Sequence, residues 1–261
     1  MKTSKNIFVY LLFSLFIFGC NSDSSDDSPP ARTYNDVRAD FDSIDFLTGS
    51  NDISLLNQHG NFWNFRVVMP DVDLTNNNRP LIIRLHGASG GNPDAHLNTE
   101  CYVEPGFASL DPIIISPNGG NFLWEDITNQ EKVLSLIDLA ATYLPVDHGK
   151  IVVTGYSNGG NGSWYFGESQ PNVFSAAIPV ASSYNTVTNG AARLMEIPMY
   201  VIHGENDELF DIQMTQDWVQ ASVDVGSDIT FEMAPGLTHI EPCNYVQYLQ
   251  NAALWLVNDV W

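Results

Sequence analysis

A serine stands between two glycines at the end of a run of β-branched residues. Residues 150–160 read KIVVTGYSNGG, so Gly155 and Gly159 flank Ser157 two positions away on either side. After a strand and before a helix, G-x-S-x-G is typical of a turn that projects a nucleophilic serine above a sheet. The glycines then remove side chains that would collide with the neighbouring strand and helix. The alternative is a glycine-rich turn that carries no chemistry.

A serine hydroxyl is a weak nucleophile unless a base removes its proton. In such an arrangement an acid follows a later strand, and a histidine follows the strand after that. Residues 199–207 read MYVIHGEND, and residues 229–240 read ITFEMAPGLTHI. We therefore predict Asp207 as the acid and His239 as the general base of the serine.

Other side chains near these strands are weaker candidates for the same roles. Glu205 and Asp211 lie close to Asp207 in the sequence and compete as the acid. His203 competes with His239, but it falls inside the strand end, where a packed structural role is expected.

Acyl transfer also needs hydrogen-bond donors for the developing oxyanion. The residue after the nucleophile supplies one, so we predict the backbone N–H of Asn158. Residues 81–91 read LIIRLHGASGG, a loop that directly follows a strand. The N–H of Ala88 is the predicted second donor, with Gly87 as the alternative. The competing interpretation is a flexible glycine loop.

Apolar runs indicate the elements that must position these residues. Several runs are continuous rather than alternating, which is typical of buried parallel strands. The predicted strands are residues 62–69, 81–85, 113–116, 151–154, 176–180, 199–203 and 229–233.

Helical patterns lie between the predicted strands. Helices are expected at residues 157–169, 212–223 and 244–258, and a further helix ends at Pro145. Its apolar face is predicted to hold Leu134, Ile137, Ala141 and Leu144. Alternating strands and helices predict an α/β fold with a mostly parallel sheet, in which ligands bind at the carboxyl ends of the strands.

The N-terminus has the pattern of an export signal. Lys2 and Lys5 precede an apolar run at residues 7–18, which is too short to span a bilayer comfortably. Residues 17–20 (IFGC) resemble a bacterial lipoprotein cleavage box, so Cys20 is the predicted lipidated residue. Ordinary signal-peptide cleavage near the same place is the alternative.

The chain then divides into three predicted parts. They are a signal peptide at residues 1–19, a disordered Ser/Asp/Pro-rich tether at residues 20–33 and one catalytic domain at residues 34–261. We expect a monomer outside the cytoplasm, either secreted or held at a bacterial membrane or cell surface by the lipid on Cys20.

The remaining cysteines, Cys101 and Cys243, form an even pair in an oxidising compartment. A disulfide between them is predicted, against the alternative of two free buried thiols. Their spacing does not suggest a metal site, since the sequence has neither CxxC nor HExxH.

The formal net charge of −21, from 31 acidic and 10 basic residues, argues against nucleic acid as a partner. Phosphate binding needs clustered Lys and Arg, so this charge indicates a solvated acidic surface instead.

Three stretches together resemble a known family of secreted esterases. LIIRLHG, SPNGGNFLWED and LIDLAATYLPVDHGKIVVTGYSNGG are similar to the group of feruloyl esterases, acetylxylan esterases and polyhydroxybutyrate depolymerases. The resemblance implies an α/β-hydrolase fold that needs no cofactor, and it implies the same Ser157, Asp207 and His239. It also suggests that Trp124 contacts the substrate; the alternative is a buried core tryptophan. The segment GLTHIEPCNY departs from the usual glycine-histidine-tryptophan pattern of this group.

The sequence as a whole predicts an extracytoplasmic serine carboxylic ester hydrolase, acting on feruloyl, acetyl or polyester-type esters. A serine peptidase of the same fold and a non-catalytic surface lipoprotein that binds ligand are the alternatives. Residues 181–198 are too few for a folded cap over the serine. We therefore expect an open cleft, with Tyr156, Trp124 and Trp164 as its walls.

Overall fold

The predicted strands form one sheet, together with a strand that was not predicted. The computed structural model describes residues 31–75 and 77–261, so the predicted signal peptide and Cys20 lie outside the described residues. In order across the sheet, the strands are β1 (Gly49–Leu56), β2 (Phe62–Met69), β4 (Ile113–Pro117), β3 (Arg79–Leu85), β5 (Val146–Tyr156), β6 (Ala176–Val180), β9 (Met199–Gly204) and β10 (Ile229–Ala234).

The direction of the strands changes at one edge of the sheet. β1 pairs with β2 and β2 pairs with β4 in antiparallel register, whereas all pairs from β4 to β10 are parallel. The predicted, mostly parallel α/β sheet is therefore confirmed, and its six parallel strands end on the same edge.

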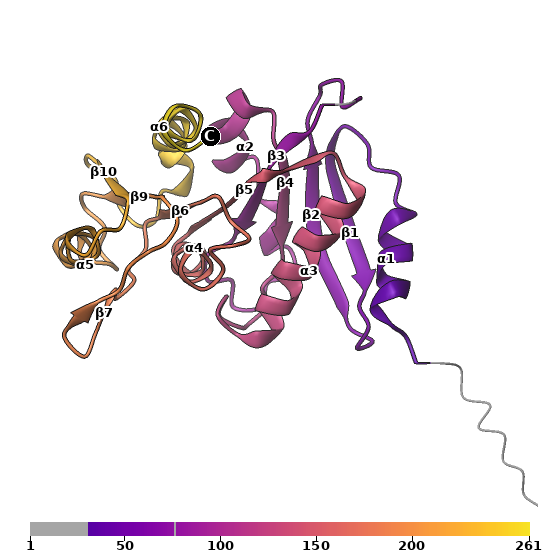
Figure 1. Ribbon diagram of the computed structural model, residues 1–261, viewed down its shortest axis with the longest axis horizontal. Helices are drawn as coiled ribbons and strands as arrows, with labels where there is room; N and C mark the ends of the chain where they lie inside the picture. Colours follow the sequence, from indigo (N-terminus) through magenta and orange to yellow (C-terminus); the bar gives the residue numbers. More distant parts are fainter. Residues whose placement is uncertain (1–30, 76) are drawn as a thin grey trace, which may run out of the picture. The chain divides into compact units, whose positions relative to one another are not determined.

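Helices cover both faces of this sheet (Figure 1). Residues of α1 (Tyr34–Asp42), α3 (Ile127–Tyr143), α4 (Asn158–Ser169) and α5 (Ile212–Asp224) belong to one apolar core. Residues of α2 (Val103–Phe107) and α6 (Val246–Trp255) belong to the core on the opposite face.

Strand β3 shows why one sheet can serve two cores. Leu81, Ile83 and Leu85 face the core of α1, α3, α4 and α5, while Ile82 faces the core of α2 and α6. Successive side chains of a strand point to opposite faces of the sheet, so a continuous apolar run contributes buried side chains to both faces.

The apolar face of α3 differs from the predicted one. Leu134 and Ala141 are only half-buried, and Leu144 lies outside the helix in extended backbone before Pro145. The helix instead buries Val133, Leu136 and Ala140, together with two polar residues, Asn129 and Lys132. Hydrogen bonds, and not apolar character, hold those two, so the apolar pattern alone could not show how the helix is rotated.

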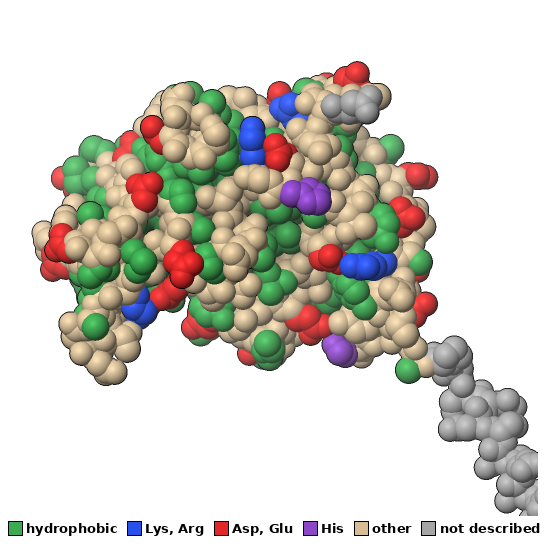
Figure 2. Space-filling view, in the orientation of Figure 1, with side chains coloured by type: hydrophobic (Ala, Val, Ile, Leu, Met, Phe, Trp, Pro, Cys, Tyr) green, Lys and Arg blue, Asp and Glu red, His purple; other side chains and the backbone are tan. Residues whose placement is uncertain are grey.

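The acidic surface follows from the composition. Figure 2 shows Asp and Glu side chains spread over the visible face of the molecule, with only scattered Lys and Arg. Among the residues that the structure describes, no helix is long and apolar enough to cross a membrane.

The predicted disulfide is present. Cys101, just before α2, is bonded to Cys243, which lies in the 3-10 turn Pro242–Tyr245 before α6. The bond joins residues separated by 142 positions and ties the segment after His239 to α2 on the same face of the sheet.

We expect the disulfide to contribute strongly to the free energy of unfolding. In the chain-entropy account, cross-linking so long a loop stabilises the fold by about 4–5 kcal/mol. A Cys101→Ser/Cys243→Ser double variant should therefore unfold at markedly lower denaturant concentration than the wild type. Reductant should lower the unfolding midpoint of the wild type toward that of the variant, and should leave the midpoint of the variant unchanged. Two alkylatable thiols at these positions in unreduced protein would contradict the pairing.

Candidate active site

Ser157 lies in a strained turn between β5 and α4. Its backbone has φ 58° and ψ −121°, a conformation that residues other than glycine rarely adopt. Its N–H donates to the carbonyl of Val180 on β6, at 3.0 Å. Such strain costs on the order of 1–3 kcal/mol and persists only where surrounding contacts enforce it.

The two flanking glycines make this turn possible. A Cβ on Gly159 would lie 2.0 Å from the carbonyl oxygen of Leu85, at the end of β3. A Cβ on Gly155 would lie 2.3 Å from the carbonyl oxygen of Gly159. Both distances are well below van der Waals contact, so the chain can follow this path only with glycine at the two positions.

The hydroxyl of Ser157 begins a chain of hydrogen bonds. Its Oγ lies 2.8 Å from Nε2 of His239, and Nδ1 of the same ring lies 2.8 Å from Oδ2 of Asp207. Since the carboxylate only accepts, Nδ1–H donates to Asp207, and Nε2 is left with a lone pair toward the serine hydroxyl. Serine, histidine and aspartate follow β5, β10 and β9, and so meet at one edge of the sheet.

Asp207 is held in its charged form. Its side chain is buried, which by itself raises the pKa, but hydrogen bonds from His239 and from the N–H groups of Phe210 and Leu209 outweigh this effect. The pKa of Asp207 is therefore lowered from its usual value of 3.8. A buried carboxylate that stays ionised can orient the imidazole and stabilise its protonated form.

His239 is fixed by its backbone as well as by its ring. Its N–H donates to Oε2 of Glu208 at 2.9 Å, and its carbonyl accepts from the hydroxyl of Tyr156. The rings of Phe210 and His239 pack edge to face, with their centroids 5.2 Å apart. Sequence reasoning missed Glu208, although an acidic residue directly after the predicted acid was a visible signal.

The weaker candidates for the acid and the base are held by other partners, although Nε2 of His203 lies 3.7 Å from Oδ2 of Asp207. Glu205 accepts from the N–H of Gly236, and Asp211 accepts from the N–H of Met214 at the start of α5. His203 is fully buried, and its Nε2 donates to the carbonyl of Phe210 at 2.9 Å. None of the three contacts Ser157.

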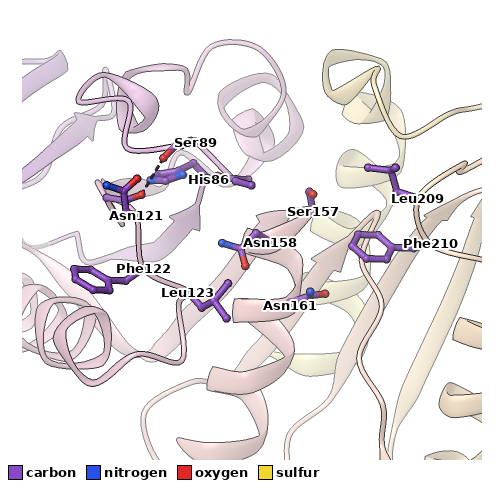
Figure 3. A pocket seen from close by; sticks show the side chains of 14 residues that line it. His86, Ser89, Asn121, Phe122, Leu123, Ser157, Asn158, Asn161, Leu209 and Phe210 are labelled. Atoms are coloured by element: carbon purple, nitrogen blue, oxygen red, sulfur yellow. Dashed lines mark hydrogen bonds between the residues drawn. The ribbon is translucent and has the colours of Figure 1, made fainter.

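The two predicted oxyanion donors lie at the cleft that holds Ser157. Asn158 is the first residue of α4, and Ala88 lies in the loop after β3; both residues line the same cleft as Ser157. Figure 3 shows Asn158 beside Ser157. Neither N–H donates to a backbone carbonyl outside the regular elements among the described residues. The helix N-terminus adds positive potential at this point.

Buried side chains hold the loop that carries Ala88. His86 donates from Nδ1 to the carbonyl of Gly87 at 2.7 Å, and its Nε2 accepts from the N–H of Gly119 at 2.8 Å. Trp124 donates from Nε1 to the carbonyl of His86 at 2.9 Å. Burial lowers the pKa of His86 from 6.5 to about 4, so the ring remains neutral and keeps its acceptor.

Comparisons with known proteins agree with this geometry. The sequence profile of the phospholipase/carboxylesterase family matches residues 125–253, which include Ser157, Asp207 and His239. No curated protein is similar enough in sequence to count as a match. Many solved structures share the fold, and three illustrate the range.

The first is a thermostable esterase, with 20% sequence identity and a TM-score of 0.67 over 80% of this chain; the chain spans only 62% of that protein. The fluorophosphonate-binding serine hydrolase FphF of Staphylococcus aureus has 17% identity and a TM-score of 0.67, over 81% of this chain and 99% of the other. A ferulic acid esterase of the anaerobic fungus Anaeromyces mucronatus has 16% identity and a TM-score of 0.58, over 80% and 90%.

The chain has the α/β-hydrolase fold. At these identities the structural likeness establishes the fold, and the family match together with the hydrogen-bonded serine, histidine and aspartate makes it a serine hydrolase related to carboxylesterases. Among the described residues, no group of three or more His, Cys, Asp or Glu is placed to hold a metal ion.

The prediction that Trp124 contacts substrate is wrong for this hydrolase. Its side chain is 0% exposed and lies beneath the loop that carries Ala88. The small residues Gly119 and Gly162 leave the space that the indole fills, since a Cβ on either would come within 3.0 Å of it. Trp164 is also buried, stacked on Tyr184.

Tyr156 is close to the site but is mostly buried. Its ring is 7% exposed, and its hydroxyl supports His239 rather than facing the cleft that holds Ser157. Tyr156 is not among the residues that line that cleft, so its predicted role as a wall is not supported; its hydroxyl donates instead to the backbone carbonyl of His239.

The walls of the cleft come from loops that sequence reasoning did not single out. The cleft has a volume of about 410 Å³ and is lined on one side by Phe122 and Leu123 and on the other by Leu209 and Phe210 (Figure 3). Phe122 is 55% exposed and Leu209 is 65% exposed. Loop residues show no periodicity, so their only signal was their position in the loops that follow β4 and Asp207.

Neutral His86 makes a testable contribution to acid stability. The folded pKa of about 4 lies below the unfolded value of 6.5, so the unfolded chain gains a proton first as the pH falls. The free energy of unfolding therefore falls by roughly 3 kcal/mol as the pH drops from 6.5 to about 4. In His86→Gln the amide oxygen can still accept from the N–H of Gly119, but it does not titrate. The melting temperature of this variant should therefore fall less between pH 7 and pH 4 than that of the wild type. An equal fall in both proteins would contradict this, and His148→Gln, at an exposed histidine, is the control.

Proposed function

We propose that this hydrolase cleaves carboxylic esters outside the cytoplasm through an acyl-enzyme, with Ser157 as nucleophile, His239 as general base and Asp207 as the acid that orients it. The observation that carries the proposal is the continuous hydrogen-bonded chain of these three side chains, which ends at a serine in the strained turn. A non-catalytic surface lipoprotein would have no reason to keep all of these features together.

The geometry supports the following sequence of steps. Ser157 Oγ attacks the ester carbonyl while His239 Nε2 takes its proton, and Asp207 stabilises the resulting imidazolium. The N–H groups of Ala88 and Asn158 bind the oxyanion. The tetrahedral intermediate collapses, and His239 Nε2 returns the proton to the departing alcohol. A water molecule then attacks the acyl-enzyme by the same route and releases the acid.

Apolar walls and an open cleft favour a bulky or aromatic acyl group, of the feruloyl or polyester type. Phe122 and Leu209 present apolar surface at opposite ends of the cleft, where a ring or a chain can pack. Residues 181–198 form only the short antiparallel pair β7 (Val187–Thr188) and β8 (Ala191–Ala192), with no helix over the serine. A polymer-linked ester could therefore lie across Ser157.

The export pattern at residues 1–20 supports placement outside the cytoplasm, with Cys20 as the lipid attachment site. An anchored hydrolase with an open cleft is suited to substrates that are too large to enter a cell.

Ser157→Ala should abolish ester hydrolysis while the fold stays intact. Removing the nucleophile of such a triad costs on the order of 10⁶ in turnover. Hydrolysis of p-nitrophenyl acetate and labelling by a fluorophosphonate probe both measure this. Ser169→Ala, at the exposed end of the same helix α4, is the matched control and should behave as the wild type. Activity of Ser157→Ala within tenfold of the wild type would exclude the assignment.

A series of acyl chains tests the shape of the cleft. A cavity of this size accommodates acyl groups up to roughly octanoate, so activity on p-nitrophenyl esters should fall for longer chains. Methyl ferulate should be cleaved, and no jump in rate should occur at a lipid interface. Leu209→Ala should raise KM for the aryl ester, whereas Leu194→Ala, also exposed but outside the cleft, should not. Preference for long-chain triglycerides with interfacial activation, or for a chromogenic peptide, would contradict this substrate class.

A further inference from the structure

A second hollow lies beside the loop that carries the predicted oxyanion donor. It has a volume of about 390 Å³ and shares His86, Gly87, Ala88 and Ser89 with the cleft of Ser157. Its other walls are different: they come from the end of β3, from the segment 92–102, and from Tyr156 and Pro242 on the histidine side. A Cβ on Gly87 would lie 3.5 Å from Cβ of Ser157, so only this loop separates the hollow from the nucleophile.

Arg84 lies in the wall of this second hollow. It belongs to β3, two residues before His86, and is only 4% exposed. Its Nη1 donates to the carbonyl of Ala95 at 3.0 Å and to Oγ of Ser116 at 3.1 Å, and its guanidinium lies over the ring of Tyr102. Nε has only a long contact of 3.4 Å to the hydroxyl of Tyr102.

Arg84 differs from every other described arginine in having no carboxylate partner. The other five each form an ion pair with an Asp or Glu; they are Arg32, Arg38, Arg66, Arg79 and Arg193. Within the described part of the chain, no carboxylate oxygen lies within 4.0 Å of Arg84, and its Nη2 has no hydrogen-bond acceptor. Asp94 lines the same hollow but is exposed and is not paired with it.

An unpaired guanidinium at this depth calls for an anion. Arginine cannot lose its charge in a protein, so burial does not neutralise it as it would a lysine or a histidine. A buried charge is normally paired, because removing it from water without compensation is costly. The planar group suits a carboxylate, which offers two oxygens to it. Tyr102 and Tyr156 supply apolar walls for the part of the ligand that carries the carboxylate.

We propose that the second hollow is a subsite for a carboxylate carried by the ester substrate, with Arg84 as its binding residue. The inference rests on the proposed ester hydrolysis, since it places the carboxylate on a molecule whose ester carbon is at Ser157. The carboxylate belongs either to the alcohol part or to the acyl part of that ester.

Matched pairs of esters test the subsite and distinguish the two parts. For the alcohol part the pair is an acetoxybenzoate, in its 3- and 4-isomers, against the methyl ester of the same compound. For the acyl part it is p-nitrophenyl hydrogen glutarate against p-nitrophenyl pentanoate. The experiment measures the ratio of kcat/KM for the charged ester to kcat/KM for the neutral ester. A charge-assisted hydrogen bond should raise this ratio to about tenfold or more for one pair in the wild type.

Substitution of Arg84 assigns the preference to this residue. Arg84→Gln should lower the charged-to-neutral ratio about tenfold, whatever happens to the absolute rates. Arg79→Gln, at the other end of β3, should leave the ratio unchanged. If Arg84→Gln does not fold, Arg84→Lys keeps the charge but loses the planar fork and should give a reduced ratio. A wild-type ratio at or below one for all pairs, or a ratio unaffected by substitution of Arg84, would overturn the proposal.

A direct binding measurement separates failure of this inference from failure of the proposed function. Calorimetry should show that 4-hydroxybenzoate binds the wild type more tightly than 4-hydroxybenzamide does, by about tenfold, and this requires no turnover. Equal binding of the two compounds, together with a ratio at or below one for the glutarate pair, would overturn the subsite even in an active esterase. Preferential binding of the benzoate without hydrolysis of any ester would support the subsite and exclude the proposed reaction.

Discussion

The close contact between helix α4 and the end of strand β3 is the constraint on which the site depends. The carbonyl oxygen of Leu85 occupies the place where a side chain on residue 159 would begin. Because α4 approaches so closely, the chain must turn from β5 into the helix within one residue, and Ser157 takes the strained conformation. The same contact brings the loop after Leu85 beside the first turn of α4. Ser157 and the predicted oxyanion donors are thus positioned by one packing interaction.

The histidine depends on a different set of supports. Its ring, its N–H and its carbonyl are each held by a separate side chain, from Asp207, Glu208 and Tyr156 respectively. These come from two strand ends, and the disulfide to Cys243 fixes the segment that follows. An imidazole held at three points loses little freedom when the substrate arrives, which favours reaction in a fixed geometry.

Much of this arrangement could be predicted from the sequence, because its causes are local. A strand, a serine between glycines, and a later acid and histidine have fixed positions relative to strand ends, and the structure brings Ser157, Asp207 and His239 together. The rotation of α3 could not be predicted, since buried hydrogen bonds of Lys132 and Asn129 override the apolar pattern.

The features that failed depend on three-dimensional packing. Whether Trp124 faces solvent is decided by the space beside Gly119 and Gly162, which come from different segments. The first two strands show the same limit. β2 alternates buried and exposed positions and was predicted, whereas β1 has only one fully buried residue and few apolar ones, so it gave little signal. The cleft walls lie in loops, where no repeat in the sequence reports burial.

The short β7–β8 pair has a kinetic consequence. Where a cap covers the serine of such an enzyme, the cap must open before product can leave, and that motion can limit turnover. In this hydrolase the segment between β6 and β9 needs no such movement. Under the proposed mechanism, its rate would then be governed by formation and breakdown of the acyl-enzyme. With no helix between β6 and β9 over the serine, water would also reach such an intermediate, which would favour hydrolysis over transfer of the acyl group to a second alcohol.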